Sequence, residues 1–247
     1  MLDTQAILSS GRIKTDITDE SVTPVAGRQC EIAYSASITI DIPTKYMLYL
    51  PKDYGADVNK RWPLVFFLHG MGSWGADVTK LKKYGPVKLV EDGREFPFIL
   101  VSPLCPVFFH WCYQIEWLKE LLDKIEADYS VDNNRIYLTG LSMGGYASWA
   151  LAARQPDRFA AIVPICGGGN PNDAPLMKDI PMWVFHGDKD RVVPLSESQK
   201  MVDAVKAAGG NPKFTIYPGV DHDSWTDTYN NGEVWDWLLE QRRTARV

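Results

Sequence analysis

The sequence has 247 residues, 45% of them hydrophobic and 23% charged, with a net charge of −5, which suits one α/β domain with a sizeable core. The acidic balance offers no electrostatic case for nucleic-acid binding, and no apolar run approaches the roughly 18 residues that a membrane span needs. Residues 1–20 lack a basic start and a long apolar block. We therefore expect a soluble protein without a signal peptide in this sequence, either cytoplasmic or secreted after its signal was removed.

The four cysteines are Cys30, Cys105, Cys112 and Cys166. They are too scattered for a zinc site and too few for a disulfide scaffold, so no metal is expected. Cys105 and Cys112 could form a bridge, but free or buried thiols are the preferred interpretation. Cys166 ends an apolar run and should pack in the core.

The N-terminal part of the chain is predicted to contribute a surface arm followed by an edge hairpin. Residues 1–30 are polar and mixed in character, and we expect them to form a surface arm. Alternating residues indicate strands at Glu31–Ile42 and Lys45–Leu50, which would form an antiparallel hairpin at one edge of the sheet. Residues 51–62 are expected to be a loop.

Farther along the chain, apolar runs of strand length alternate with segments of helical pattern. Strands are expected at 63–69, 98–102, 136–138, 160–166, 181–185 and 214–217, and helices at 78–92, 113–127, 143–155, 195–208 and 234–243. This alternation predicts a mostly parallel central sheet with helices on both faces. The chain shows no internal repeat, linker or large helical insertion, so we expect one domain over residues 1–247 without a large cap domain.

The segment Gly140–Gly144 carries a Gly-x-Ser-x-Gly motif between a predicted strand and a predicted helix. Turning from strand to helix within about one residue strains the backbone at Ser142. It leaves no room for side chains two positions before and after the serine. This arrangement would present the hydroxyl at the sheet edge as a nucleophile. The alternative is a glycine-rich turn in which the serine only caps a helix.

A serine hydroxyl is a poor nucleophile until a base takes its proton, and the chain has four histidines. On such an elbow the base follows the serine in the chain, which leaves His186 and His222. His186 directly ends a strand and is expected to be structural. His222 lies in the loop after the last strand, where a base is needed, so we predict His222 as the base.

The base in turn needs a carboxylate that orients it and stabilises its protonated form. Asp221 and Asp223 adjoin His222, and neighbours in a loop seldom point at one another. Asp190 lies in the loop after the preceding strand and is the preferred acid, with Asp188 as the fallback. The other aspartates are expected to form turns or caps.

Two backbone amides are candidates for holding an oxyanion. The Met143 amide would lie at a helix N-terminus, where partial positive charge favours a developing negative charge. Met71 lies between Gly70 and Gly72 in the loop after the first buried strand, and these glycines would let its amide approach a substrate closely. His69 is expected to brace this loop rather than to act as a second base.

Gly70, Gly72 and Gly75 also match a dinucleotide-binding fingerprint that follows a strand. The acidic residue that should end the next strand is absent, since 99–102 leads into Pro103. We therefore expect no cofactor.

Four motifs in chain order resemble those of the α/β-hydrolase superfamily, over roughly residues 45–240. They are Leu68-His-Gly-Met-Gly72, Gly140-Leu-Ser-Met-Gly-Gly145, His186-Gly-Asp-Lys-Asp190 with Val193-Pro194, and His222-Asp-Ser-Trp225. More narrowly, they are similar to the phospholipase/carboxylesterase group and to predicted-peptidase and feruloyl-esterase-like (polyhydroxybutyrate-depolymerase-like) proteins. The resemblance implies an α/β-hydrolase fold and these roles: nucleophile Ser142, acid Asp190, base His222 and oxyanion amides Met71 and Met143.

This sequence departs from the resembling proteins after the oxyanion loop. Relatives often carry a charged Gly-Glu-Arg-Gly segment there, whereas this chain has Gly72-Ser-Trp-Gly75. An indole thus replaces charge near the site, so the substrate of a relative does not transfer directly.

Together these features predict a serine carboxylesterase that hydrolyses small or polymer-attached esters, including polysaccharide-attached ones, through an acyl-enzyme. The alternatives are a feruloyl/cinnamoyl or acetyl-xylan esterase, a serine peptidase, or a non-catalytic ligand-binding protein on the same fold. The oligomeric state is left open.

Aromatic residues in loops on the catalytic side could line an apolar substrate pocket or only pack these loops against the sheet. They are Trp74, Phe108, Phe109, Trp111 and Trp225. Trp225 is favoured as a loop anchor. With no cap domain we expect an open site that prefers small or polymer-attached esters to long acyl chains.

Overall fold

The computed structural model describes residues 44–106 and 109–243. The chain divides into a unit of residues 1–43 and a unit of residues 44–247, and every element below belongs to the second. The predicted arm and the first strand of the predicted hairpin, 31–42, lie outside the described residues. Among the helices of the described part, none is long and apolar enough to span a bilayer.

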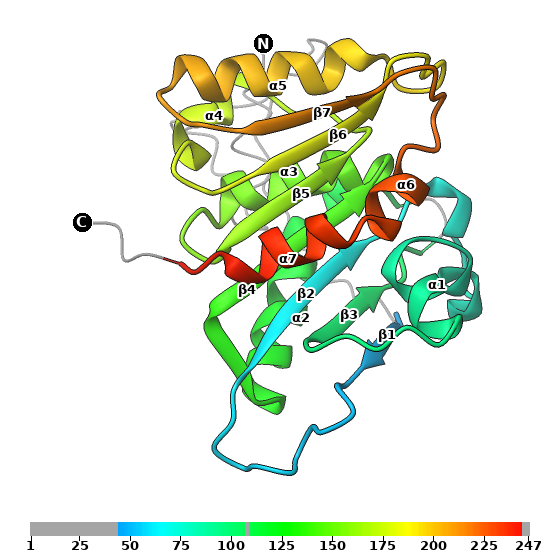
Figure 1. The fold of residues 1–247 in the computed structure, drawn as a ribbon, viewed down its shortest axis with the longest axis vertical. Coiled ribbons are helices and arrows are strands. Elements are labelled where there is room, and N and C mark those ends of the chain that lie inside the picture. Colours follow the sequence, from blue (N-terminus) through cyan, green and yellow to red (C-terminus); the bar gives the residue numbers. More distant parts are fainter. Residues whose placement is uncertain (1–43, 107–108, 244–247) are drawn as a thin grey trace, which may run out of the picture. The chain divides into compact units, whose positions relative to one another are not determined.

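Seven strands form one sheet in the described part of the chain (Figure 1). They are β1 (Tyr46–Tyr49), β2 (Trp62–Leu68), β3 (Ile99–Pro103), β4 (Val131–Leu141), β5 (Ala161–Ile165), β6 (Trp183–Gly187) and β7 (Lys213–Tyr217). Their order across the sheet is β1-β3-β2-β4-β5-β6-β7. β1 pairs antiparallel with β3, and all the other pairs are parallel. This mostly parallel sheet confirms the predicted fold class.

β2 is apolar throughout because both faces of the sheet are covered there. Every residue of β2 is buried, and successive side chains of a strand point to opposite faces. Leu64, Phe66 and Leu68 accordingly join one core cluster, whereas Val65 and Phe67 join the other. β2 therefore has no position for a solvated side chain, whereas β4 carries exposed polar residues in its first half.

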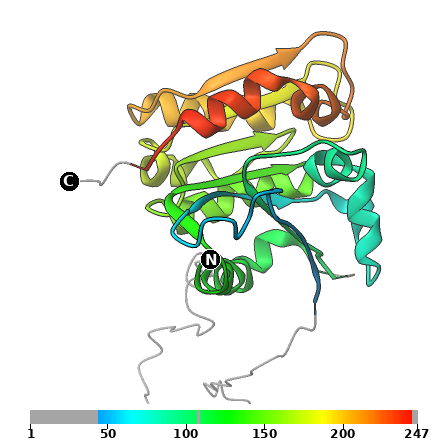
Figure 2. The same ribbon diagram turned by 60° about the horizontal axis from the view of Figure 1, so that its bottom comes forward.

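Helices lie on both faces of the sheet, as predicted (Figures 1 and 2). One face carries α2 (Ile115–Asp128), α3 (Met143–Arg154), α4 (Ala174–Met177) and α5 (Leu195–Ala207). The other carries α1 (Gly85–Glu91), α6 (Trp225–Asn230) and α7 (Gly232–Glu240). Single 3₁₀ segments occur at Met71–Ser73, Val78–Lys83, Trp111–Tyr113 and Pro171–Asp173. The described segments between strands hold only these elements and loops, so they form no cap domain.

The element boundaries differ from the predictions where short-range backbone geometry decides them. The helix expected at 78–92 is a 3₁₀ segment followed by α1, because Tyr84 is extended and Gly85 adopts a positive φ of 66°. The short helices α4 and α6 were not predicted. The start of α6 is fixed by Asp223, whose carboxylate accepts the Thr226 amide at 3.0 Å.

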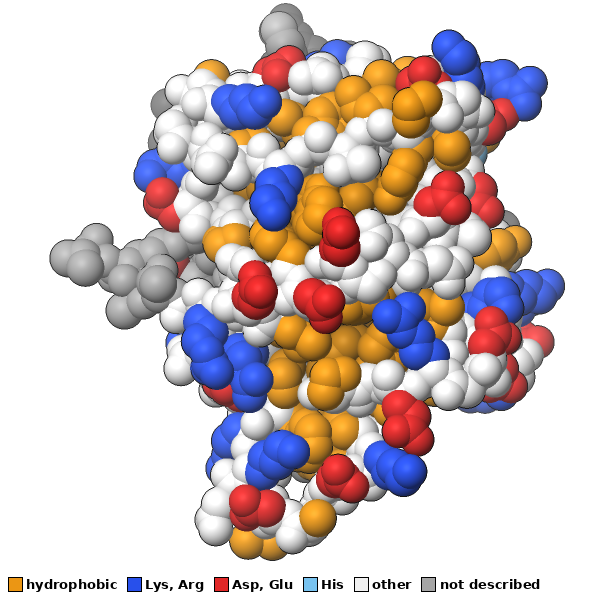
Figure 3. Space-filling view, in the orientation of Figure 1, with side chains coloured by type: hydrophobic (Ala, Val, Ile, Leu, Met, Phe, Trp, Pro, Cys, Tyr) orange, Lys and Arg blue, Asp and Glu red, His pale blue; other side chains and the backbone are white. Residues whose placement is uncertain are grey.

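Aromatic side chains, rather than a further helix, close the sheet face beside α7. The Trp183 ring lies 5.0 Å from Phe185 and 5.5 Å from Trp237, centroid to centroid. The Lys213 ammonium lies 4.6 Å above the Trp183 ring, in cation–π geometry. Figure 3 shows hydrophobic side chains visible on this face alongside α7. The C-terminal helix thus covers only part of the sheet.

The turn from β4 to α3 has the strained geometry that the motif predicted. Ser142 adopts φ 54° and ψ −116°, a conformation that L-residues rarely occupy. A Cβ atom at Gly140 would overlap the carbonyl oxygen of Gly144. A Cβ atom at Gly144 would overlap the carbonyl oxygen of Leu68 in the neighbouring strand. Both glycines are therefore required for α3 to begin directly against the ends of β4 and β2.

We expect Gly144→Ala to lower the free energy of unfolding by about 3 kcal/mol or more, because the new methyl group meets backbone that cannot move aside. Gly232→Ala is the matched control, since no atom beyond its own helix and chain neighbours lies within 4 Å of the position that its new methyl group would take, and its φ is ordinary. The control should stay within about 0.5 kcal/mol of wild type. Urea unfolding of the two variants tests this, and equal stabilities would contradict the packing argument.

Candidate active site

Ser142 lies at the junction of β4 and α3, at the carboxyl edge of the sheet. Its amide donates to the Ile165 carbonyl in β5 at 3.0 Å, and its carbonyl accepts the Tyr146 amide at 3.0 Å. The residue is therefore fixed on both sides while its side chain remains partly exposed. The backbone thus aims the hydroxyl away from the core.

His222 lies in the loop between β7 and α6, and its ring reaches the serine. The Nε2 atom of His222 lies 2.9 Å from Ser142 Oγ. The His222 amide donates to Asp221 Oδ1 at 2.9 Å, and the His222 carbonyl accepts the Ser224 amide at 2.9 Å. The imidazole also packs perpendicular to Trp225, with the ring centroids 5.2 Å apart. These contacts set the direction of the ring.

Asp190 lies in the loop after β6, with its side chain fully shielded from solvent. Its Oδ2 atom accepts His222 Nδ1 at 2.7 Å. Its Oδ1 atom accepts the amides of Val192 and Val193 at 2.9 and 2.8 Å. Three donors on one buried carboxylate stabilise its charge. This contact series assigns the proton of the neutral imidazole to Nδ1 and leaves the Nε2 lone pair facing the serine.

The other aspartates near the histidine are used in turns and caps, as expected. Asp221 pairs with Arg191, whose backbone amide, and then its guanidinium, hold the pKa of the carboxyl below its usual range. Asp223 caps α6. Asp188 accepts the Gly219 amide at 2.6 Å. The structure therefore brings only Asp190, of the four candidates, to the imidazole Nδ1.

Met71 and Met143 are each the first residue of a helical segment that begins at the same sheet edge. The amide of a first helical residue has no acceptor within its own helix. Met71 opens the 3₁₀ segment after β2 and Met143 opens α3, and the ends of these adjacent strands are in register. A Cβ atom at Gly70 would lie 3.4 Å from that of Ser142, so the loop of Met71 lies directly beside the serine.

His69 is buried and braces the loop that carries Met71, as predicted. Its Nδ1 atom donates to the Gly70 carbonyl at 2.6 Å, and its Nε2 atom accepts the Cys105 amide at 2.9 Å. Burial lowers the pKa of His69 from 6.5 to about 4. The imidazole is therefore neutral near pH 7 and acts as a fixed link between two loops.

His186 is also structural, as predicted. It is fully buried, its Nδ1 atom lies 2.8 Å from Ser198 Oγ, and its Nε2 atom lies 2.9 Å from the Val193 carbonyl. Burial holds its pKa below the ordinary value. It supports the loop that carries Asp190.

The aromatic residues predicted to line a pocket are mostly packed against the core in the described part of the chain. Trp111 has no exposed surface, and its indole N–H donates to the His69 carbonyl at 2.9 Å. Its placement therefore favours the packing alternative over substrate contact. Trp74 and Phe109 are partly buried against the same core cluster, and Trp225 anchors the histidine loop as expected. Phe108 lies outside the described residues.

Tyr84 is an exposed aromatic side chain near the site that the sequence pattern did not single out. Its ring lies 6.1 Å from Trp225 and perpendicular to it, and 39% of the residue is exposed. Met71 is 54% exposed, and its chain neighbour Gly72 lies next to the Tyr84 ring, since a Cβ atom there would be 3.8 Å from it. Met71, Tyr84 and Trp225 form what we call the apolar rim of the site.

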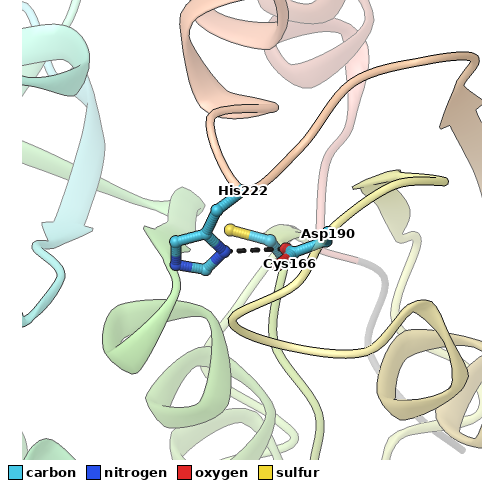
Figure 4. A group of neighbouring side chains, drawn as sticks. All are labelled: Cys166, Asp190 and His222. Atoms are coloured by element: carbon cyan, nitrogen blue, oxygen red, sulfur yellow. Dashed lines mark hydrogen bonds and ion pairs between the residues drawn. The ribbon is translucent and has the colours of Figure 1, made fainter.

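Cys166 is buried at the end of β5, as predicted, but its neighbours were not foreseen. Its sulfur lies beside the Asp190–His222 pair (Figure 4). Burial raises the pKa of this thiol to about 12, against the lowering effect of the Ser142 amide and the Ser224 hydroxyl. Cys105 and Cys112 are free thiols, and no bridge joins them. In the sequence, only the position of Cys166 at the carboxyl end of a parallel strand could have indicated that it lies near Asp190 and His222.

A serine on a strand–turn–helix elbow, with aspartate and histidine in loops after the last two strands of a mostly parallel sheet, defines an α/β-hydrolase fold. The comparisons confirm the resemblance found in the motifs, to esterases of the α/β-hydrolase fold related to feruloyl esterases. Residues 114–234 match the model of the Dienelactone hydrolase family.

The relatives by sequence include esterases and a depolymerase. A probable feruloyl esterase C of Aspergillus terreus is 28% identical over 170 residues, covering 64% of this chain and 59% of the relative. Poly(3-hydroxyalkanoate) depolymerase C of Paucimonas lemoignei is 43% identical over 51 residues, covering 21% of this chain and 12% of the relative. The chain thus spans less than two thirds of the length of these curated relatives.

Solved structures share the fold. A thermostable esterase is 35% identical, with a TM-score of 0.70, covering 80% of this chain and 59% of that chain. The feruloyl esterase module from Clostridium thermocellum, an S954A mutant complexed with sinapinate, has a TM-score of 0.60. It is 19% identical, covers 82% of this chain and 85% of that one, and so supports the fold alone.

We expect His69 to make the fold sensitive to acid. Its folded pKa of about 4 lies below its unfolded value of 6.5. Between these two pH values the unfolded chain therefore binds a proton at His69 that the folded chain does not bind. Stability is complete above pH 6.5 and falls as the pH drops toward 4, by about 2 kcal/mol from this residue at about pH 5. Urea unfolding from about pH 7.5 to 5 should show a correspondingly shallower pH dependence for His69→Gln, and parallel curves would refute the assignment.

Proposed function

We propose that this protein is a serine carboxylesterase with Ser142 as nucleophile, His222 as base and Asp190 as acid. The observation that carries the proposal is the unbroken hydrogen-bond series from Ser142 Oγ to His222 to Asp190, at 2.9 and 2.7 Å. A hydroxyl, an imidazole and a buried carboxylate in contact order are the groups that acyl transfer needs.

The geometry supports a two-step reaction. His222 Nε2 takes the Ser142 proton while Oγ attacks the ester carbonyl carbon, and the amides of Met71 and Met143 would donate to the resulting oxyanion. The protonated imidazole, stabilised by Asp190, then gives its proton to the leaving alcohol as the ester C–O bond breaks. A water molecule, deprotonated by the same imidazole, hydrolyses the acyl-enzyme and restores the serine.

The substrate that we propose is an aromatic or acetyl ester of the feruloyl and acetyl-xylan esterase type. Names among the relatives support this class: several are feruloyl esterases, and one is a bifunctional acetylxylan esterase/xylanase of Neocallimastix patriciarum. The apolar rim of Met71, Tyr84 and Trp225 supports it from this chain's own residues, since a planar acyl group can pack against it. The site has no cap domain in the described residues, which suits an ester attached to a polymer.

We expect Ser142→Ala and Asp190→Asn to lower kcat on p-nitrophenyl acetate strongly, by at least about 10⁴-fold, because each removes an interaction needed in the transition state. Asp223→Asn is the matched control: it lies beside His222 in sequence but caps α6, and Asn also caps well. It should retain kcat within about tenfold. Comparable losses in the control and in Asp190→Asn would remove the case for Asp190.

A substrate panel separates the candidate activities. We expect kcat/KM on methyl ferulate and release of acetate from acetylated xylan to exceed turnover of a peptide amide, and p-nitrophenyl esters to become poorer as the acyl chain lengthens. The reason is an open site with a short apolar rim and no tunnel for a long chain. Ser142→Ala is the blank for each substrate. A preference for long acyl chains would contradict the substrate class, and faster amide cleavage would indicate a peptidase.

A further inference from the structure

Three side chains of different chemistry converge behind the serine, each from the carboxyl end of a neighbouring strand. Cys166 follows β5, Asp190 follows β6 and His222 follows β7. The Cys166 sulfur, a carboxylate oxygen of Asp190 and a ring nitrogen of His222 all lie within 4.8 Å of one another (Figure 4). Ester hydrolysis as proposed above uses the aspartate and the histidine but has no use for the thiol.

The thiol is held in place by a strained backbone. Cys166 adopts a positive φ of 40°, which is uncommon for a residue with a side chain. Its amide donates to the Phe185 carbonyl in β6 at 2.9 Å, and the preceding carbonyl of Ile165 accepts the Ser142 amide at 3.0 Å. The surroundings therefore determine where the sulfur lies, so it is presented to the acid–base pair by the fold.

A fourth polar atom lies at the same place. The Ser224 hydroxyl is fully buried and makes no hydrogen bond of ordinary length to the described residues. It faces the Cys166 sulfur closely enough to influence the thiol. A cation bound at this thiol would find in the hydroxyl oxygen a further lone pair to bind.

This donor set suits a soft or borderline divalent cation. Thiolate, imidazole and carboxylate together bind Zn²⁺ and its heavier homologue Cd²⁺, whereas Mg²⁺ and Ca²⁺ prefer oxygen ligands alone. Zinc–ligand distances are about 2.0 Å to nitrogen and oxygen and about 2.3 Å to sulfur. The three ligand atoms already lie within 4.8 Å of one another, so a cation between them can reach all three through side-chain adjustment. The His222 side chain is 18% exposed and that of Asp190 is fully buried, so a cation would enter past the imidazole.

We propose that Cys166 turns the Asp190–His222 pair into a reversible binding site for Zn²⁺ or Cd²⁺, and that occupancy switches off the proposed esterase. The binding itself is independent of the proposed function, and only the loss of turnover rests on it. The cation is an inhibitor in this proposal and not a cofactor.

The proton balance explains the inhibition. The cation forms a bond to Cys166 sulfur, and the thiol proton leaves to solvent. The cation also binds His222 Nδ1, which requires the Nδ1 proton to move to Nε2 in the other neutral tautomer. Nε2 then has no lone pair for the Ser142 proton, and Asp190 is engaged by the cation. Attack on an ester therefore stops without any change in the serine itself.

Direct binding of Cd²⁺ tests the site without reference to activity. Isothermal titration, together with the ultraviolet thiolate-to-cadmium absorption band, should show one bound Cd²⁺ in wild type and in Ser142→Ala. Cys166→Ser should lose the band and at least about 100-fold in affinity, because losing even a group that supports a ligand costs about 10–100-fold. Cys112→Ser, which removes a thiol outside the cluster, is the matched control and should bind like wild type. Thermal unfolding without metal checks that the variants are folded.

Inhibition assays complete the test. Zn²⁺ and Cd²⁺, but not Mg²⁺, should inhibit wild type and Cys112→Ser reversibly, with recovery on adding a chelator. Each variant is compared with its own metal-free rate, and Cys166→Ser should need at least about 100-fold more metal for half inhibition. Equal binding and inhibition in Cys166→Ser would overturn the proposal. Cd²⁺ binding through Cys166 in a protein that hydrolyses no ester would uphold the site and refute the proposed function instead.

Discussion

The close approach of α3 to the ends of β2 and β4 is the constraint on which the rest of the site depends. Glycine at positions 140 and 144 removes the two side chains that would hold the helix away from the Leu68 carbonyl. The cost is the strained backbone at Ser142, where φ is 54°. In return the hydroxyl stands clear of the core, and the first amide of α3 remains without a helical acceptor at the same place. One packing contact thus sets both the proposed nucleophile and half of the proposed anion site.

The buried charge of this arrangement is the carboxylate of Asp190, and hydrogen bonds fix its position. Asp190 is shielded from solvent, yet two backbone amides and one imidazole satisfy its oxygens. The neighbouring histidines, His69 and His186, are held neutral by burial and serve as links between loops. Asp190 Oδ2 lies 2.7 Å from His222 Nδ1 and 3.3 Å from His186 Nε2, so its shorter contact is with His222. The distribution of charge in the site therefore depends on which imidazoles are buried and so remain neutral.

The sequence predicted the elements that short-range pattern controls and missed those set by packing between distant loops. Apolar runs marked the parallel strands, and the glycine spacing marked the elbow. The helix α6 was missed because a cap at Asp223, and not a long amphipathic pattern, starts it. The burial of Trp111 could not be read from its aromatic neighbours, since it depends on a hydrogen bond to the His69 carbonyl 42 positions away. Tyr84 was missed because a bend at Gly85 turns it outward.

Chemistry and specificity rest on different parts of this molecule. The proposed reacting groups follow strand ends, whose positions the hydrogen-bonded sheet fixes. The surface that a substrate would meet comes from side chains in the connecting segments, chiefly Met71, Tyr84 and Trp225. The acyl group that this site selects must therefore be decided by its own rim rather than by its superfamily, since the sheet that aligns the serine imposes nothing on the acyl side.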